Sequence, residues 1–281
     1  MSRGADAQAD VTVSPAVVTP RQVVTATVTT PAPVSEVTAA SLEWGYTNFY
    51  RYRRAATEPG SSDTDDWICV TRVELPLGTG EFEATTATFK VPSWAPASSQ
   101  EIARWSCRLK VMHSGSDIDT HGEFTVHVGR EQFADEEAVQ DPVSVVAGNA
   151  GTVIDISLPT PIVVAGDAIR GHLVLTPGPD LPDGDLGVSW QQHRESHPVQ
   201  HTAAAADVID GPIIAVGNGI RLRAGEVIRL PFAVPLPADA PPTATAVNSS
   251  MTWFLQAQLS YAGSDAHPLE RVVKPIFVVN G

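Results

Sequence analysis

The stretch ARWSCRLKV at residues 103–111 alternates apolar and polar side chains without a break. A second stretch, TWFLQAQLSY at residues 252–261, alternates in the same way around its own tryptophan. Because side chains of a β-strand point alternately to its two faces, this period of two predicts half-buried strands that direct Trp105 and Trp253 inward. Each tryptophan is followed at the same spacing by Gly-Ser-Asp, beginning at Gly115 and at Gly263. The spacing indicates two related domains.

The match between the halves extends upstream of both tryptophans at nearly the same offset. Five apolar positions correspond, namely Val18, Val23, Val28, Leu42 and Trp44 with Val164, Ile169, Val174, Val188 and Trp190. FKVP at residues 89–92 with Ala95-Pro96 likewise corresponds to FAVP at residues 232–235 with Ala240-Pro241. Gaps of a few residues separate the blocks, as expected where surface loops differ in length.

The repeat divides the 281 residues into two domains, each large enough to bury its own core. We expect an N-terminal domain at 10–128, an acidic linker at 129–150 with a possible short helix at 130–140, and a C-terminal domain at 151–281. The chain has 23 prolines, 21 glycines and no long apolar stripe of helical period. This composition predicts an all-β protein of two tandem antiparallel β-sandwiches with an immunoglobulin-like architecture.

Further strands are expected in both halves wherever short apolar runs lie between turn residues. They are 11–13, 23–29, 39–44, 67–75, 87–91 and 122–128 in the first half, and 152–157, 168–176, 187–193, 213–220, 227–234 and 272–279 in the second. Gly217-Asn218-Gly219 predicts a hairpin turn, because Asn-Gly tolerates positive φ at both central positions.

Charge and termini restrict the classes of function. A formal net charge of −14 disfavours general nucleic-acid binding, which needs an excess of clustered Lys and Arg. The first ten residues are polar and acidic, so they do not resemble a secretory signal, and no apolar run approaches the length of a bilayer span. We therefore expect a cytoplasmic protein without a transmembrane segment. Cys69 and Cys107 lie in strand-like runs where buried thiols are common, and a cytoplasmic location disfavours a disulfide.

Three stretches of the second half stand in an order known from one family of β-sandwich domains. VVAGDAIRGHLVL at 163–175 is similar to the strand that begins arrestin domains, and LRAGE at 222–226 with LPFAVP at 230–235 is similar to its middle strand and turn. SSMTWFLQA at 249–257 is similar to the serine-led aromatic strand near its end. The first half has Thr19-Pro20-Arg21 in place of the Gly-Asp turn and joins the resemblance through the repeat.

The resemblance implies two arrestin-like domains in tandem, as in bacterial sporulation-control proteins and arrestin-domain trafficking adaptors. Such a protein is expected to be a binding scaffold and not an enzyme, with no cofactor. No motif of those relatives matches closely enough to transfer a functional residue. Fold alone does not determine a partner.

Catalytic and metal-binding signatures are weak. The sequence has no nucleophile elbow, zinc-protease motif or Walker loop. Even spacing places His193, Glu195, His197 and His201 on one face of an extended chain, but His201 is too far along to share one ion unless the chain folds back. Acidic turns at Asp63, Asp65 and Asp66, at Asp117 and Asp119, and at Asp180, Asp183 and Asp185 could attract calcium, but none has the calcium-loop pattern and backbone hydrogen bonding alone explains them. We expect no metal site.

The most unusual local composition is a basic aromatic run in an otherwise acidic chain. It contains the candidate partner-binding residues Tyr46, Tyr50, Arg51, Tyr52, Arg53 and Arg54. Arg and Tyr suit an anionic or extended-peptide partner. The same residues could instead cover apolar surface on a strand and pair with Asp63, Asp65 or Glu58.

Two functions remain open from the sequence. The first is a cytoplasmic arrestin-like adaptor or regulatory scaffold, binding a protein of unknown identity through a sheet edge, a loop or the interdomain groove. The alternative is a structural or carbohydrate-binding sandwich in which Trp67 and Trp94 stack on sugar rings.

Overall fold

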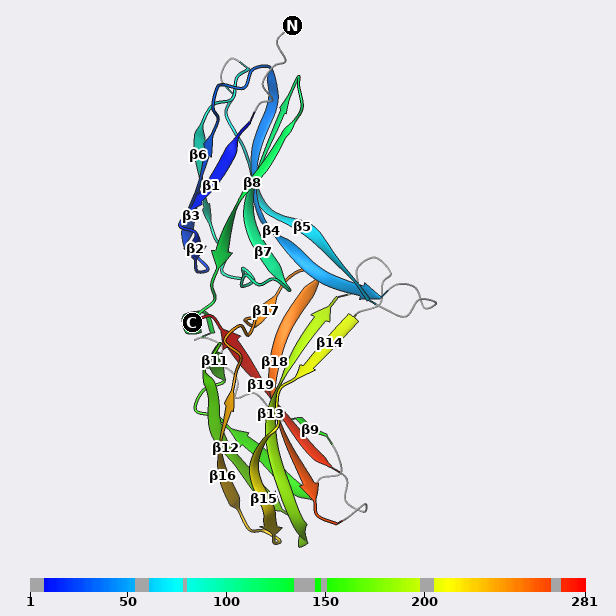
Figure 1. Ribbon diagram of the computed structural model, residues 1–281. Coiled ribbons are helices and arrows are strands. Elements are labelled where there is room, and N and C mark those ends of the chain that lie inside the picture. The colour runs from blue at the N-terminus through cyan, green and yellow to red at the C-terminus, as the bar shows by residue number, and fades with distance from the viewer. Residues whose placement is uncertain are drawn as a thin grey trace. The chain divides into compact units, whose positions relative to one another are not determined.

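The computed structural model describes residues 8–53, 61–77, 80–133, 145–147, 151–197, 205–263 and 269–281. Strands dominate these residues, beside one 3-10 helix, η1 at Arg130–Phe133. The chain forms two compact units (Figure 1). Unit 1 takes Met1–Val128, His197–Ala204 and Thr245–Ser249, and unit 2 takes Gly129–Ser196, Ala205–Ala244 and Ser250–Gly281. The predicted all-β class is confirmed, whereas the residue limits given above for the domains stay a prediction.

Unit 1 is a sandwich of two sheets. The smaller sheet has the order β1-β3-β6, with β1 at Asp10–Ser14, β3 at Val23–Thr29 and β6 at Thr85–Lys90. The larger sheet has the order β2-β8-β7-β4-β5, which places β5 at one end. Its strands are β2 at Val17–Val18, β8 at Ile118–Val126, β7 at Ala103–His113, β4 at Val37–Arg53 and β5 at Ser61–Glu74.

An aromatic cluster fills the core between these two sheets. Trp105 of β7 lies 5.9 Å from Phe124 of β8 and 4.9 Å from Tyr46 of β4, measured between ring centroids. Trp44 of β4 stacks on Phe89 of the smaller sheet at 5.2 Å. The alternation on β7 therefore points its tryptophan into the core, as predicted.

Unit 2 repeats this plan with additional strands. Its three-stranded sheet has the order β10-β12-β16, with β10 at Thr152–Ser157, β12 at Ala168–Pro177 and β16 at Ile228–Pro235. The larger sheet runs β11-β19-β18-β13-β14, and β15, β17 and β9 pair with β13, β18 and β19. These strands are β9 at Val145–Ala147, β11 at Ile162–Val164, β13 at Leu181–Ser196, β14 at Ala205–Asp210, β15 at Ile214–Leu222, β17 at Ala244–Thr245, β18 at Ser249–Tyr261 and β19 at Glu270–Val279.

Corresponding hydrogen bonds show that the two units are structural repeats. The indole Nε1 of Trp105 donates to the carbonyl of Pro96 at 2.9 Å, and Trp253 donates to Pro241 at the same distance. These prolines are the pair that the sequence alignment matched. The second residue after each proline also has the same role in both units. Ser98 Oγ accepts a hydrogen bond from the amide of Val126 in unit 1, and Thr243 Oγ1 accepts one from the amide of Val278 in unit 2.

The turn before β3 in unit 1 has the same conformation as the turn before β12 in unit 2, although their sequences differ. The amide of Gln22 donates to the carbonyl of Thr19 at 3.2 Å, and Asp167 donates to Val164 at 3.0 Å. The third residue of each turn has positive φ, 73° at Arg21 and 85° at Gly166. A type II turn requires this φ and favours glycine there. Unit 1 therefore keeps the turn at the cost of placing a non-glycine residue in the left-handed region.

Replacing Arg21 with glycine is expected to raise the free energy of unfolding by about 0.5–1 kcal/mol. A side chain in the left-handed region costs roughly 1–2 kcal/mol, and the greater backbone entropy of glycine in the unfolded chain offsets part of that gain. Arg21→Ala is the matched control, because it removes the same side chain but keeps the Cβ. Urea unfolding of both variants distinguishes them, and equal midpoints would rule out strain at this position.

One expectation from the sequence needs correction. Gly217-Asn218-Gly219 is not a hairpin turn but lies inside β15. There Leu186 pairs with Gly217, and Gly184 pairs with Ile220. Between these two pairs β15 advances by three residues while β13 advances by two. This extra residue makes a β-bulge, which the positive φ of 59° at Gly219 accommodates.

The stretch expected to be a linker contains regular structure. Residues 130–133 form η1, while 134–140 of the predicted helix lie outside the described residues. Residues 145–147 form β9, which pairs with β19 through Val145 and Val273. Pairing to an existing strand gives this short apolar segment its structure, and nothing in its local sequence predicted that partner.

Candidate functional site

The basic aromatic run on β4 is divided between the core and the surface. Tyr46 is 1% exposed and packs on Trp105, and burial raises the pKa of its hydroxyl despite an opposing hydrogen bond with the backbone of Val247. Tyr50 is also buried, and its hydroxyl donates to Asp66 Oδ2 at 2.8 Å. These two rings therefore fill the interior and present little surface to a partner.

The structure describes three side chains of the predicted patch, and of these Arg51 lies at the surface. Its Nε lies 2.6 Å from Oδ1 of Asp63, which was one of the pairings considered from the sequence. Tyr52 and Arg53 continue β4, but their side chains lie outside the described part, as does the whole of Arg54. Partner binding by this patch stays a prediction.

A more extensive surface is the β5 edge, by which we mean residues 63–74 of β5. This strand pairs with β4 from Ser61 to Glu74, and no described strand pairs with its other side. None of residues 63–74 is buried. An edge strand of this length offers a row of backbone N–H and C=O groups to another chain. In Figure 1 β5 lies beside β4 on the outer border of its sheet.

Charge is unevenly distributed along the β5 edge. Asp63, Asp65 and Asp66 lie near its start, and Asp66 also accepts a hydrogen bond from Asn248 Nδ2 at 3.1 Å. Near its end, Arg72 lies 2.8 Å from Glu74 and 3.6 Å from the buried Glu43. Asp63 is paired with Arg51, so Asp65 and Asp66 give the first part of the edge its negative charge, while charges in the last part are largely paired.

The middle of the β5 edge is apolar. The guanidinium of Arg108 lies 3.8 Å from the centroid of Trp67, which is half-buried. A Cβ at Gly45 would overlap the carbonyl oxygen of Ile68 and come within 3.0 Å of the Trp67 ring. Glycine at 45 thus allows β5 and its tryptophan to lie close against β4. Because Arg108 covers the ring, Trp67 is less suited to stacking on a sugar than the sequence suggested, whereas Trp94 is 59% exposed.

The two cysteines differ in environment. Cys69 is exposed on the β5 edge, Cys107 of β7 is buried, and both are free thiols. Burial raises the pKa of Cys107 to about 12. The pKa of Cys69 is raised as well, by partial desolvation and then by Glu43, against lowering by Lys110 and Arg72. The expectation of a buried thiol is therefore confirmed at Cys107 and wrong at Cys69, because an edge strand leaves one flank uncovered.

The described residues do not assemble a metal site. No group of three or more His, Cys, Asp or Glu side chains converges within the described ranges, and His201 lies outside them. His193 instead packs on Phe254, with ring centroids 4.6 Å apart. Asp180 and Asp185 accept backbone amides of Ala224 and Gly219, at 3.0 and 2.8 Å, which is the turn-forming role considered from the sequence.

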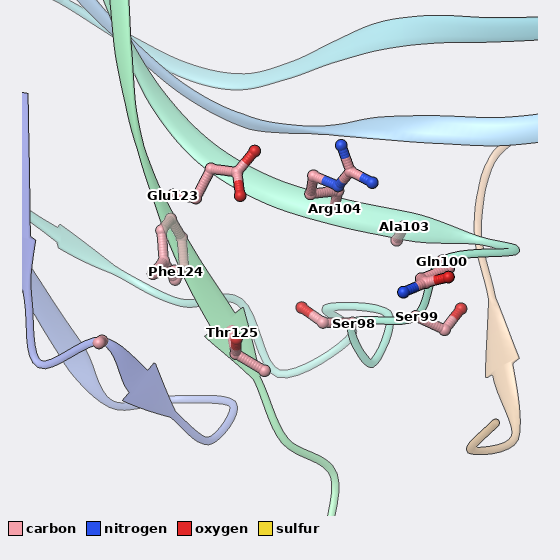
Figure 2. Close-up of a pocket in the computed structure, with 9 residues that line it drawn as sticks. Ser98, Ser99, Gln100, Ala103, Arg104, Glu123, Phe124 and Thr125 are labelled. Carbon is pink, nitrogen blue, oxygen red and sulfur yellow. The ribbon is translucent and has the colours of Figure 1, made fainter. Parts of the chain in front are cut away.

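A second candidate site is a polar cavity in unit 1, which the sequence did not indicate. Its volume is about 400 Å³, and it lies between the loop before β7 and the strands β7 and β8 (Figure 2). Hydroxyl, amide and charged side chains line it at Ser98, Ser99, Gln100, Arg104, Glu123 and Thr125, and Ala16, Ala103 and Phe124 add apolar surface. Neither histidine nor cysteine is among the residues that line it. Its residues come from four segments, which include Ala16 before β2, and only the folded sheet brings them together.

These features define a class of protein: two antiparallel β-sandwich units with a long open edge strand and a small polar cavity. No family model and no curated protein matches the chain. Among solved structures it is similar to Spo0M, a sporulation control protein from Bacillus subtilis. The TM-score is 0.38 with 17% identity, over 47% of this chain and 51% of that chain, so the match spans about half of each protein. Within the described residues, no helix is long and apolar enough to span a bilayer.

Proposed function

We propose that this chain is a non-enzymatic, arrestin-like adaptor or regulatory scaffold of the cytoplasm that binds an extended segment of a protein partner along the β5 edge. The observation that carries the proposal is the pairing of β5, which is complete toward β4 and open on its other side among the described strands. Adding a strand to such an edge gives affinity through backbone hydrogen bonds, without a conspicuous side-chain motif. The absence of such a motif from the sequence is consistent with this mode of binding.

The charges of the β5 edge favour a particular partner chemistry. Asp63, Asp65 and Asp66 would lie opposite one end of the added strand, where basic side chains are favoured across the strand pair. Trp67 and Ile68 would face the middle, where apolar or β-branched side chains can pack. The partner segment is therefore expected to be basic at one end and apolar in its centre.

Cys69 provides a direct test, because it is an exposed thiol on the proposed edge while Cys107 is buried. A photoreactive maleimide attached at Cys69 is expected to cross-link one reproducible protein segment from extracts of the native cells. The cross-linked residues should lie in a basic and apolar extended stretch, and a peptide of that stretch should slow amide hydrogen exchange along β5. Labelling should accelerate as pH rises toward the raised pKa of Cys69, since the thiolate is the nucleophile.

The matched control moves the label away from the edge. The double variant Cys69→Ser with Asp119→Cys carries an exposed thiol on β8 of the same sheet. Equal capture from both labelled proteins, or unchanged exchange along β5, would exclude the edge as the binding site. A third variant with Arg51, Arg53 and Arg54 changed to alanine tests the basic patch, and loss of capture there would extend the interface onto β4.

One observation favours the alternative of carbohydrate binding. Trp94, in the segment between β6 and β7, exposes 59% of its surface, which suits stacking on a sugar ring. Glycan-array binding that disappears in Trp94→Ala would support this alternative. An array without reproducible binding would leave Trp94 as an isolated exposed side chain.

A further inference from the structure

We infer that the polar cavity of unit 1 binds a small ligand whose carboxylate stands beside an N–H donor. This chemistry is shared by a free α-amino acid and by the last residue of a peptide. The site is independent of the β5 edge, because β4 separates β7 from β5 in the sheet order. Its volume of about 400 Å³ leaves ample room for a ligand of that size.

The cavity offers hydrogen-bond donors that the fold leaves available. Ser98 Oγ accepts the amide of Val126 at 2.9 Å, and Ser99 Oγ accepts the amide of Ile102 at 3.0 Å. A serine hydroxyl also carries one proton to donate. None of the hydrogen bonds among the described residues uses the proton of either hydroxyl, so both serines can donate to an acceptor in the cavity.

Arg104 adds a positive charge to these donors. The acceptor group of the ligand is therefore expected to be a carboxylate. Its guanidinium lies 5.3 Å from the ring centroid of Phe49, and this cation–π contact restricts where the group can point. The planar fork of a guanidinium donates two parallel hydrogen bonds to a carboxylate. With the two serines and the amide of Gln100, donors predominate in the lining.

Glu123 sets the second requirement on the ligand. It is the acidic member of the lining, and the structure places its Oε1 3.8 Å from His121 Nε2 but gives it no ion pair with Arg104. Figure 2 shows Glu123 and Arg104 on neighbouring strands, with Ser98, Ser99 and Gln100 along the adjoining loop. A carboxylate that is not neutralised by Arg104 accepts an N–H and repels a ligand of higher negative charge. An amide or ammonium group beside a single carboxylate meets both conditions.

The test is a titration of the full-length ¹⁵N-labelled protein followed by amide chemical shifts. Three probes are compared: glycine, N-acetylglycine and N-acetylglycinamide, which lacks the carboxylate. We expect glycine, N-acetylglycine or both to shift the amides of Ser99, Gln100, Arg104 and Thr125 in a saturable way. Binding of N-acetylglycine alone would identify a chain terminus as the ligand, and binding of glycine alone a free amino acid. Shifts as large with N-acetylglycinamide, or no localised shifts with any probe, would overturn the inference.

Two arginine variants show whether the charge of this site is responsible. Arg104→Gln is expected to weaken binding of the carboxylate probe at least about tenfold, because charge-assisted hydrogen bonds are the strongest of the set. Arg108→Gln is the matched control on the same strand, since its guanidinium lies on Trp67 away from the cavity. Arg104 is exposed, so amide spectra outside the cavity should stay unchanged and report intact folding. Equal affinities of both variants would contradict the site.

Discussion

Replacing Trp105 with alanine is expected to lower the free energy of unfolding of unit 1 by about 3–5 kcal/mol, the range for large aromatic side chains removed from packed cores. The indole is fully buried, and its ring centroid lies within 6.4 Å of those of Tyr46, Phe89 and Phe124. Since Phe89 belongs to the smaller sheet and the others to the larger one, the change opens a cavity between the two layers. Urea unfolding followed by tryptophan fluorescence measures the loss.

Two further variants show whether the loss of stability comes from the buried position of Trp105 or from removing a tryptophan as such. Trp94→Ala removes an indole that is 59% exposed, and its cost should stay within about 0.5 kcal/mol. Trp105→Phe keeps an aromatic ring but removes the hydrogen bond to Pro96 and part of the buried volume, which should cost about 1–3 kcal/mol, as should Trp253→Phe at Pro241. If Trp105→Ala costs no more than Trp94→Ala, the aromatic cluster does not stabilise unit 1.

The core strands could be predicted because apolar and polar residues alternate in the sequence of a strand that has one buried face. Residues 23–29 and 152–157 were expected as strands and form β3 and β10 within the same limits. In β10 the exposure alternates at every residue, since one face packs on the core and the other meets solvent. A repeat of period two survives in the sequence wherever a strand has one buried face.

Strands that depend on distant partners could not be predicted. Val17 and Val18 form β2 by parallel pairing with β8, more than a hundred residues away in the chain. Polar residues in the core of unit 2 escaped notice for the same reason. Lys274 is 6% exposed, and its Nζ donates to the carbonyl of Ile156 at 2.7 Å. A lysine in an alternating strand gives no local sign that a backbone carbonyl will accept its proton.

The candidate sites likewise depend on contacts between distant segments, which the local sequence does not predict. The resemblance to arrestin domains and the repeat indicated two sandwiches, but not which strand would stand at an open edge. Tyr and Arg alternate from Tyr50 to Arg53 as on an exposed strand, yet Tyr46 and Tyr50 face inward because their strand continues across the core. The cavity could not be expected, because the pairing of β7 with β8 places Arg104 and Glu123 on neighbouring strands and the hydrogen bond from Val126 to Ser98 holds the loop beside them.

A segment distant in sequence completes unit 1 through Asn48. The residues Thr245–Ser249 belong to this unit, and Asn48, which is fully buried, binds them with both ends of its side-chain amide. Its Oδ1 accepts the amide of Asn248 at 2.7 Å, and its Nδ2 donates to Ser249 Oγ and to the carbonyl of Ile102, each at 2.8 Å. A buried amide with partners at both ends contributes more than an isolated hydrogen bond.

Asn48→Ala is therefore expected to lower the free energy of unfolding by about 2–3 kcal/mol, because it leaves the amide of Asn248 buried without an acceptor. Ser249→Ala should cost only about 1 kcal/mol, since it removes one hydroxyl from the same group. The double variant should cost less than the sum of the two, because both single changes remove the bond between Nδ2 and Oγ. Urea unfolding of the four proteins gives the coupling. Strictly additive costs, or a loss at Asn48 no greater than at Ser249, would show that this amide does not hold the segment in unit 1.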